Sequence, residues 1–141
     1  MRRLQNTGKI ALTSGGNRLF LSGTMATESE RIDWDQLDMM ADGYTRDFVE
    51  IYREFIGQTP ELLDALEKHL RDDNLAAARD AAHKIKGSSA NFGFVGVSGP
   101  MSRLEMKAKE EGSLEGAPEA MLEARENFEG AKAEIREKRG I

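Results

Sequence analysis

The stretch DAAHKIKGSSANFG, residues 80–93, organises the rest of the chain. In a helix, residues three and four apart share one face. Small or apolar residues at this spacing form a stripe that is expected to face a core, namely Leu75, Ala78, Ala82, Ile85, Ser89 and Phe92. The neighbouring row consists of Arg79, His83, Lys86, Gly87 and Ala90. His83 is therefore placed at the boundary between core and water.

The remaining sequence predicts further helices and no strand. Apolar residues recur at intervals of three and four, and no segment alternates polar and apolar residues as a half-buried strand does. We expect one short helix and four long ones, at about residues 33–40, 45–70, 75–92, 95–111 and 118–138. Long amphipathic helices joined by short loops favour an all-α fold, an antiparallel up-down-up-down four-helix bundle with an additional short N-terminal helix.

Local signals mark the helix ends. Asp33 and Asn74 are suited to N-cap positions, and Pro118 suits the first turn of the last helix. Gly93 can take the left-handed conformation that ends the helix carrying His83. Pro100 weakens the first half of the helix at 95–111, because proline cannot donate a backbone hydrogen bond.

Composition limits the class of protein. With 141 residues, 39% of them hydrophobic, the chain is the size of one domain with a core. It has no cysteine, which excludes a thiolate metal site and a cysteine nucleophile and is typical of a cytoplasmic protein. No apolar run reaches the roughly 18 to 20 residues that span a bilayer, so no membrane insertion is expected.

Charge separates residues 1–30 from the rest. Residues 1–25 hold four basic residues and no acidic one, so the remaining 16 basic residues face 25 acidic ones, a net charge of −9. We expect residues 1–30 to be a disordered or tag-like leader and residues 31–141 to form the bundle. The acidic balance argues against nonspecific nucleic-acid binding, because phosphate contacts need a basic face.

Gly87 and Lys86 indicate that the imidazole of His83 reacts with or binds another group. Near neutral pH an imidazole has a lone pair available for attack or for metal binding. Gly87 costs about 0.8 to 1 kcal/mol relative to alanine in a helix interior, which indicates a need for space beside the ring. Lys86 can place an ammonium beside a group that joins the imidazole. Structural roles for the histidine and the lysine stay open at this point.

Glu105 is predicted to complete the site from the next helix. His83 lies ten residues before Gly93 and Glu105 twelve after it, so antiparallel helices bring them to nearly equal height. A carboxylate that accepts a hydrogen bond from Nδ1 leaves Nε2 unprotonated and stabilises the ring after Nε2 attacks. The alternative is a Glu105 that pairs in water with Arg103 or Lys109.

The run HKIKGSSANFG at residues 83–93, followed by Leu104 and Glu105, resembles the signature of histidine-containing phosphotransfer (HPt) domains of two-component phosphorelays. The similarity extends over roughly residues 33–138. It implies a four-helix bundle that exchanges a phosphoryl group with aspartates of receiver domains and needs no cofactor. By this resemblance His83 is the phosphoacceptor, Lys86 stabilises the phosphoryl group, Gly87 gives access and Glu105 orients the ring.

The partners that the resemblance implies are receiver domains of response regulators or hybrid histidine kinases. We expect a monomer whose partner-binding surface includes Arg79, Lys84, Ser88, Ala90 and Phe94. Arg103 and Lys107 are further basic residues expected on or near the histidine face, where they would complement an acidic receiver site.

Two other readings of the sequence remain. One is a helical bundle that binds proteins without being phosphorylated, and the other is a metal-binding bundle in which Asp80 and His83 supply a carboxylate and an imidazole. The chain has neither a nucleotide-binding loop nor a kinase glycine signature, so an enzyme that uses ATP is not expected.

Overall fold

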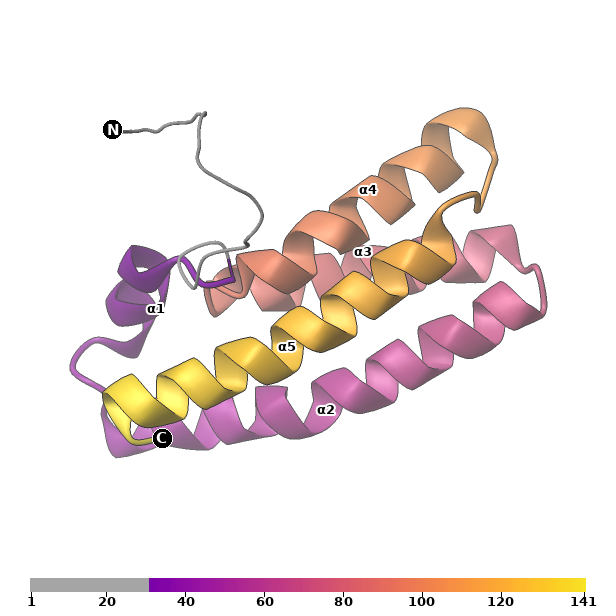
Figure 1. The fold of residues 1–141 in the computed structure, drawn as a ribbon. Helices are drawn as coiled ribbons and strands as arrows, with labels where there is room; N and C mark the ends of the chain where they lie inside the picture. The colour runs from indigo at the N-terminus through magenta and orange to yellow at the C-terminus, as the bar shows by residue number, and fades with distance from the viewer. Residues whose placement is uncertain (1–30) are drawn as a thin grey trace, which may run out of the picture. The chain divides into compact units, whose positions relative to one another are not determined.

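The computed structural model describes residues 31–141, and all regular structure within them is helical. The helices are α1 (Trp34–Ala41), α2 (Arg46–Arg71), α3 (Leu75–Asn91), α4 (Val95–Glu111) and α5 (Ala117–Arg139). Helices α2 to α5 form the bundle, and the short α1 covers one end of it (Figure 1). The predicted fold class is confirmed, and each predicted helix end lies within one residue of the observed one. The prediction for residues 1–30 lies outside the described residues.

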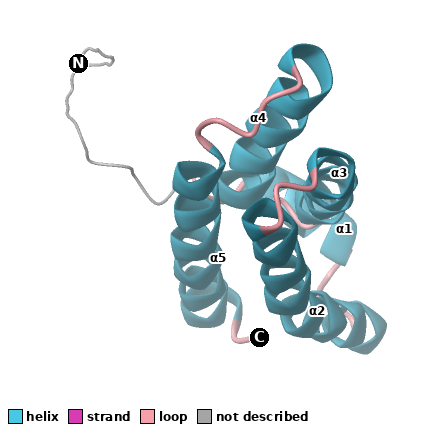
Figure 2. Ribbon diagram, turned by 90° about the vertical axis from the view of Figure 1, so that its right-hand side faces the viewer, coloured by secondary structure: helices cyan, strands magenta, loops and turns pink. Residues whose placement is uncertain are grey.

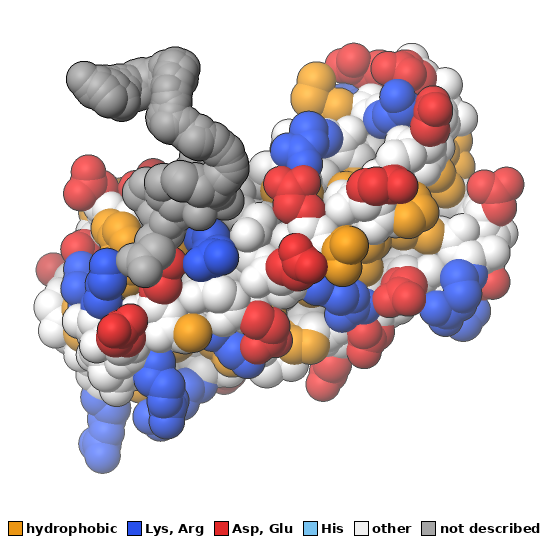
Figure 3. Space-filling view, viewed as in Figure 1, with side chains coloured by type: hydrophobic (Ala, Val, Ile, Leu, Met, Phe, Trp, Pro, Cys, Tyr) orange, Lys and Arg blue, Asp and Glu red, His pale blue; other side chains and the backbone are white. Residues whose placement is uncertain are grey.

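The four long helices surround a common core (Figure 2). Helix α3 packs against α2 and α4, and α5 packs against α4 and α2. None of the helices within residues 31–141 is long and apolar enough to cross a bilayer. Acidic and basic side chains are interspersed over the face that α5 and α2 present in Figure 3.

Aromatic rings fill the core where α3 turns into α4. Phe55 of α2 stacks on Phe92 with the ring centroids 4.4 Å apart, and meets Phe94 edge-on at 4.9 Å. Phe128 of α5 lies against Phe94 at 5.9 Å. Such pairs add about 0.5 to 1.5 kcal/mol each beyond the burial of their area. The turn between α3 and α4 is thus held by side chains from α2 and α5.

Gly93 makes this turn possible. The Gly93 N–H donates to the carbonyl of Ala90 and the Phe94 N–H to that of Ser89, the two hydrogen bonds of a Schellman motif. Gly93 has a φ of +75°, and a Cβ at this position would lie 2.5 Å from the Asp33 carbonyl oxygen. The Asp33 N–H in turn donates to the Gly93 carbonyl over 2.7 Å. The segment before α1 therefore lies directly against a turn that only glycine can form.

Pro100 removes a backbone hydrogen bond from α4, and a side chain of α5 supplies a donor in its place. Proline cannot donate to the carbonyl four residues earlier, which is that of Gly96. The side-chain amide of Asn127 donates to this Gly96 oxygen over 3.0 Å. A Cβ at Gly96 would lie 2.7 Å from the Asn127 Cβ, so the absence of a side chain at Gly96 permits the approach. Helix α4 is continuous across Pro100 as a result.

We expect Asn127→Ala to lower the free energy of unfolding by about 1 to 3 kcal/mol, because the Gly96 carbonyl loses its donor. In a Pro100→Ala background the new N–H can donate to Gly96, so the same substitution should cost about 1 kcal/mol less. Urea unfolding of the four proteins measures this coupling. An equal cost in both backgrounds would show that Asn127 acts through packing alone.

Candidate functional site

His83 lies in the middle of α3 with an exposed ring. Helix α3 buries Ala82 and Ile85, and this orientation directs the His83 side chain to the edge of the helix beside α4. The side chain is 67% exposed, and its Nδ1 atom lies 2.7 Å from Oε2 of Glu105. The contact between His83 and Glu105 that the sequence predicts is present in the structure.

Glu105 joins two side chains of α3. Its second oxygen, Oε1, lies 2.7 Å from Nζ of Lys86, and the Glu105 side chain is only 13% exposed. His83 and Lys86 are three residues apart and share one helix row, so one carboxylate can reach both. The sequence predicted the partner of His83 but not the ion pair of Lys86, although the spacing of the two residues was a signal for it.

The charge of Glu105 decides which ring nitrogen carries the proton. Partial burial raises the pKa of Glu105, but the contacts with Lys86 and His83 outweigh burial and hold the pKa below its ordinary value of 4.5. The carboxylate is therefore ionised near neutral pH and can only accept hydrogen bonds. Nδ1 of His83 therefore donates to Glu105, and in the neutral form of the ring this places the lone pair on Nε2.

Gly87 leaves open space one turn beyond His83. A Cβ added at Gly87 would meet nothing within 4 Å. No contact within residues 31–141 therefore requires a glycine here, although glycine costs about 0.8 to 1 kcal/mol in a helix interior. Ala90, the next residue of the same row, is exposed. These small residues leave a ledge beside the imidazole, which we define as the surface of Gly87 and Ala90.

Four of the five residues predicted to bind a partner reach the surface. Arg79, Lys84 and Ala90 are exposed. Ser88 is half-buried, and its hydroxyl donates to the carbonyl of Ile85 over 3.2 Å. Their contribution to binding a partner stays a prediction.

The prediction that Phe94 contributes to a partner-binding surface is wrong. Its side chain is 0% exposed and packs among the core rings. Phe94 directly follows Gly93 in the Schellman motif, where the apolar residue after the glycine commonly packs back against the helix that has just ended. The turn therefore directs this ring inward.

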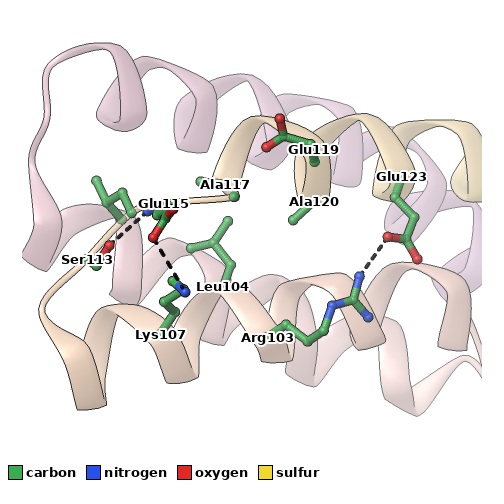
Figure 4. A pocket seen from close by; sticks show the side chains of 11 residues that line it. Arg103, Leu104, Lys107, Ser113, Glu115, Ala117, Glu119, Ala120 and Glu123 are labelled. Atoms are coloured by element: carbon green, nitrogen blue, oxygen red, sulfur yellow. Dashed lines mark hydrogen bonds and ion pairs between the residues drawn. The ribbon is translucent and has the colours of Figure 1, made fainter.

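Arg103 and Lys107 also lie elsewhere than the sequence suggested. Each is two residues from Glu105, which places it on the opposite side of α4. They line a pocket between α4 and the start of α5, where Arg103 binds Glu123 over 2.6 Å (Figure 4). The expectation that these two residues lie on the histidine face is wrong.

The metal-binding alternative lacks a ligand set in the described part of the chain. Within residues 31–141, no three side chains of the types His, Asp and Glu gather closely enough to hold a metal ion. Asp80 instead lies 3.3 Å from Nε of the neighbouring Arg79.

Comparison with known proteins identifies a family. The family model described as "Hpt domain" matches residues 50–134. The phosphorelay intermediate protein YPD1 of Candida albicans is 26% identical in an alignment of 84 residues, which covers 55% of this chain and 44% of YPD1. The chain thus matches less than half the length of that relative.

Two solved structures share the fold. The crystal structure of histidine-containing phosphotransfer protein B (HptB) from Pseudomonas aeruginosa PAO1 matches with a TM-score of 0.71 and 24% identity, covering 78% of this chain and 95% of HptB. The HPT domain of the Hpt sensor hybrid histidine kinase from Shewanella matches with a TM-score of 0.62 and 17% identity, covering 75% of this chain and 91% of that domain.

The pKa of Glu105 predicts how its contribution to stability depends on pH. A pKa below 4.5 in the folded chain means that the charged carboxylate stabilises the fold above this value, and that the stabilisation is lost as pH falls through the folded pKa. Glu105→Gln cannot gain or lose this charge. We therefore expect the variant to be less stable than the wild type at pH 7, with the gap in unfolding free energy narrowing at about pH 3. Urea unfolding at both pH values measures the gap; an unchanged gap would contradict the assignment.

Proposed function

The chain belongs to the Hpt domain family, and from this premise we propose that it is a histidine phosphocarrier of two-component phosphorelays, with His83 as the phosphoacceptor. The observation that carries the proposal is the exposed imidazole of His83, whose Nδ1 is held at 2.7 Å by an ionised carboxylate. The partners are receiver domains of response regulators or of hybrid histidine kinases.

The proposed transfer step uses the His83 ring with its proton on Nδ1 and its lone pair on Nε2. The lone pair on Nε2 attacks the phosphorus of a receiver's aspartyl phosphate. A nitrogen–phosphorus bond forms, and the phosphorus–oxygen bond breaks with its electron pair going to the receiver's carboxylate. The Nδ1 proton stays on the ring in its hydrogen bond to Glu105, which stabilises the positive charge that the ring acquires. The reverse sequence passes the group to another aspartate.

Lys86 and Gly87 assist this exchange in different ways. A phosphoryl group carries close to two negative charges near neutral pH, and the ammonium of Lys86 extends from the same helix row as His83. Lys86 therefore stabilises the group once it is on the ring. The ledge of Gly87 and Ala90 lets a receiver bring its aspartate to Nε2 without meeting a side chain.

The chain is a carrier that depends on another protein for phosphate. Its sequence has no glycine-rich loop for ATP phosphates and no kinase signature. We therefore assign it no ATP-using catalytic site and no cofactor. Its activity is the acceptance and return of a phosphoryl group.

The first test is phosphorylation by a receiver domain that carries radiolabelled phosphate. We expect an acid-labile, base-stable label on the wild type and none on His83→Gln, because an amide cannot act as the nucleophile. His69→Gln is the matched control: this half-buried histidine in the last turn of α2 lies outside the site, so the variant should keep the label. Label persisting on His83→Gln would end the proposal. A folded wild type that takes no label would favour the bundle that only binds proteins.

The second test concerns the ledge. Gly87→Ala should raise the free energy of unfolding by about 0.5 to 1 kcal/mol, since alanine favours the helix and the space is open. Gly87→Leu should slow transfer from a receiver by about 10²-fold, the scale expected when reacting groups are displaced by roughly 1 Å. Phosphoramidate, a small phosphodonor, should label both variants at the wild-type rate. A Gly87→Leu protein that accepts phosphate from a receiver at the normal rate would remove the access role.

A further inference from the structure

We propose that Glu105 and the phosphoryl group on His83 compete for the ammonium of Lys86, so that Glu105 sets how far His83 is phosphorylated at equilibrium. This inference rests on the proposed function of His83 as phosphoacceptor. It assigns Glu105 a second role besides orienting the ring.

The first observation is that Lys86 is already engaged before any phosphate arrives. Its Nζ lies 2.7 Å from Oε1 of Glu105, while Oε2 of the same carboxylate lies 2.7 Å from Nδ1 of His83. With Lys86 in place Oε1 is buried, and beyond this ion pair it accepts no hydrogen bond within residues 31–141. The ion pair of Lys86 and Glu105 is therefore the resting arrangement of the site.

The second observation is the direction of the ring. Glu105 binds the imidazole through Nδ1, and the phosphoryl group joins Nε2, which points from the ring in another direction. Lys86 is 34% exposed and has a flexible stem, so its ammonium can leave the carboxylate for the phosphoryl oxygens. It then exchanges one negative charge, which is shielded from water, for a group with nearly two charges that is open to water.

The competition gives Glu105 two opposed effects. Through the ring it stabilises the positive charge that the phosphorylated imidazole carries, which favours phosphorylation. Through Lys86 it opposes the phosphorylated state, because each phosphorylation takes the cation away from an oxygen that has no other partner within residues 31–141. An intermediate carrier needs this balance, because it must accept a phosphoryl group and then release it to another protein.

A double-mutant cycle on the phosphotransfer equilibrium tests the proposal. The fraction of phosphorylated chain is measured at the plateau reached with a phosphorylated receiver domain, for the wild type, Glu105→Gln, Lys86→Met and the double variant. Glutamine can still accept the Nδ1 hydrogen bond but does not form an ion pair. We expect Glu105→Gln to raise the equilibrium constant for phosphorylation when Lys86 is present. The factor of this increase should be roughly ten times larger than the factor that the same substitution produces in the Lys86→Met background.

The cycle separates competition from other effects of the Glu105 charge. Repulsion between Glu105 and the phosphoryl group, or support of the ring alone, acts regardless of residue 86, so equal effects in both backgrounds would overturn the proposal. Lys109→Met is the matched control, because Lys109 lies one turn from Glu105 on α4 and is exposed. The effect of Glu105→Gln should be the same in this control background as in the wild type.

A second measurement does not depend on a receiver. Phosphoramidate transfers its phosphoryl group to Nε2 as its own phosphorus–nitrogen bond breaks and ammonia leaves. We expect Lys86→Met to shift the carbon-13 signal of the Glu105 carboxylate in the free chain and to shift it much less in the phosphorylated chain. Equal shifts in both states, or an Nε2 that phosphoramidate does not label, would overturn the competition. The effect of Lys86→Met on the Glu105 signal could also be lost on phosphorylation in a chain that exchanges no phosphoryl group with receivers. That result would support the competition and refute the proposed function.

Discussion

The alignment of α4 along α3 determines whether His83 and Glu105 can meet, and the turn at Gly93 sets that alignment. Neighbouring residues of a helix differ by about 1.5 Å in height and 100° in direction, so a slip of one residue would turn Glu105 away from His83. The turn resists such a slip because its hydrogen bonds, its left-handed glycine and its contact with Asp33 all depend on one alignment. The rings of Phe92 and Phe94 anchor the same turn in the core. Structural residues far from the imidazole thus position it.

Within that frame, a single carboxylate organises the chemistry. A largely buried charge is costly unless it is paired, and Glu105 meets this condition with one contact for each oxygen. The pairing keeps Glu105 ionised, so that Nδ1 of His83 donates a hydrogen bond to it and Nε2 faces away from the carboxylate. It also occupies Lys86, the cation that a phosphoryl group would use. Under the proposed function the site needs few parts, because a carrier supplies a nucleophile and an accessible surface, while the phosphate comes from its partner.

Features that depend on local periodicity could be predicted from the sequence. Predictions failed where the position of a side chain depends on its surroundings in the folded bundle. Counting residues on either side of Gly93 brought His83 and Glu105 together, because antiparallel helices have a regular rise. The same counting could not show that Phe94 turns inward, since that depends on the conformation of the turn. The amide of Asn127 on the Gly96 carbonyl was missed as well. Pro100 indicates that this carbonyl lacks a donor, but no pattern tells which distant residue supplies one.

The sequence by itself determined the five helices, their order, the row that carries His83 and the family to which the chain is similar, because helix periodicity and helix caps act over a few residues. Only the tertiary structure decided that Lys86 shares the carboxylate of Glu105, that Arg103 and Lys107 lie on the other side of α4, and that no contact within residues 31–141 fills the space at Gly87. These facts depend on which groups from separate helices come within about 3 to 4 Å, the range of hydrogen bonds and packing contacts. That proximity arises when the bundle closes around its core.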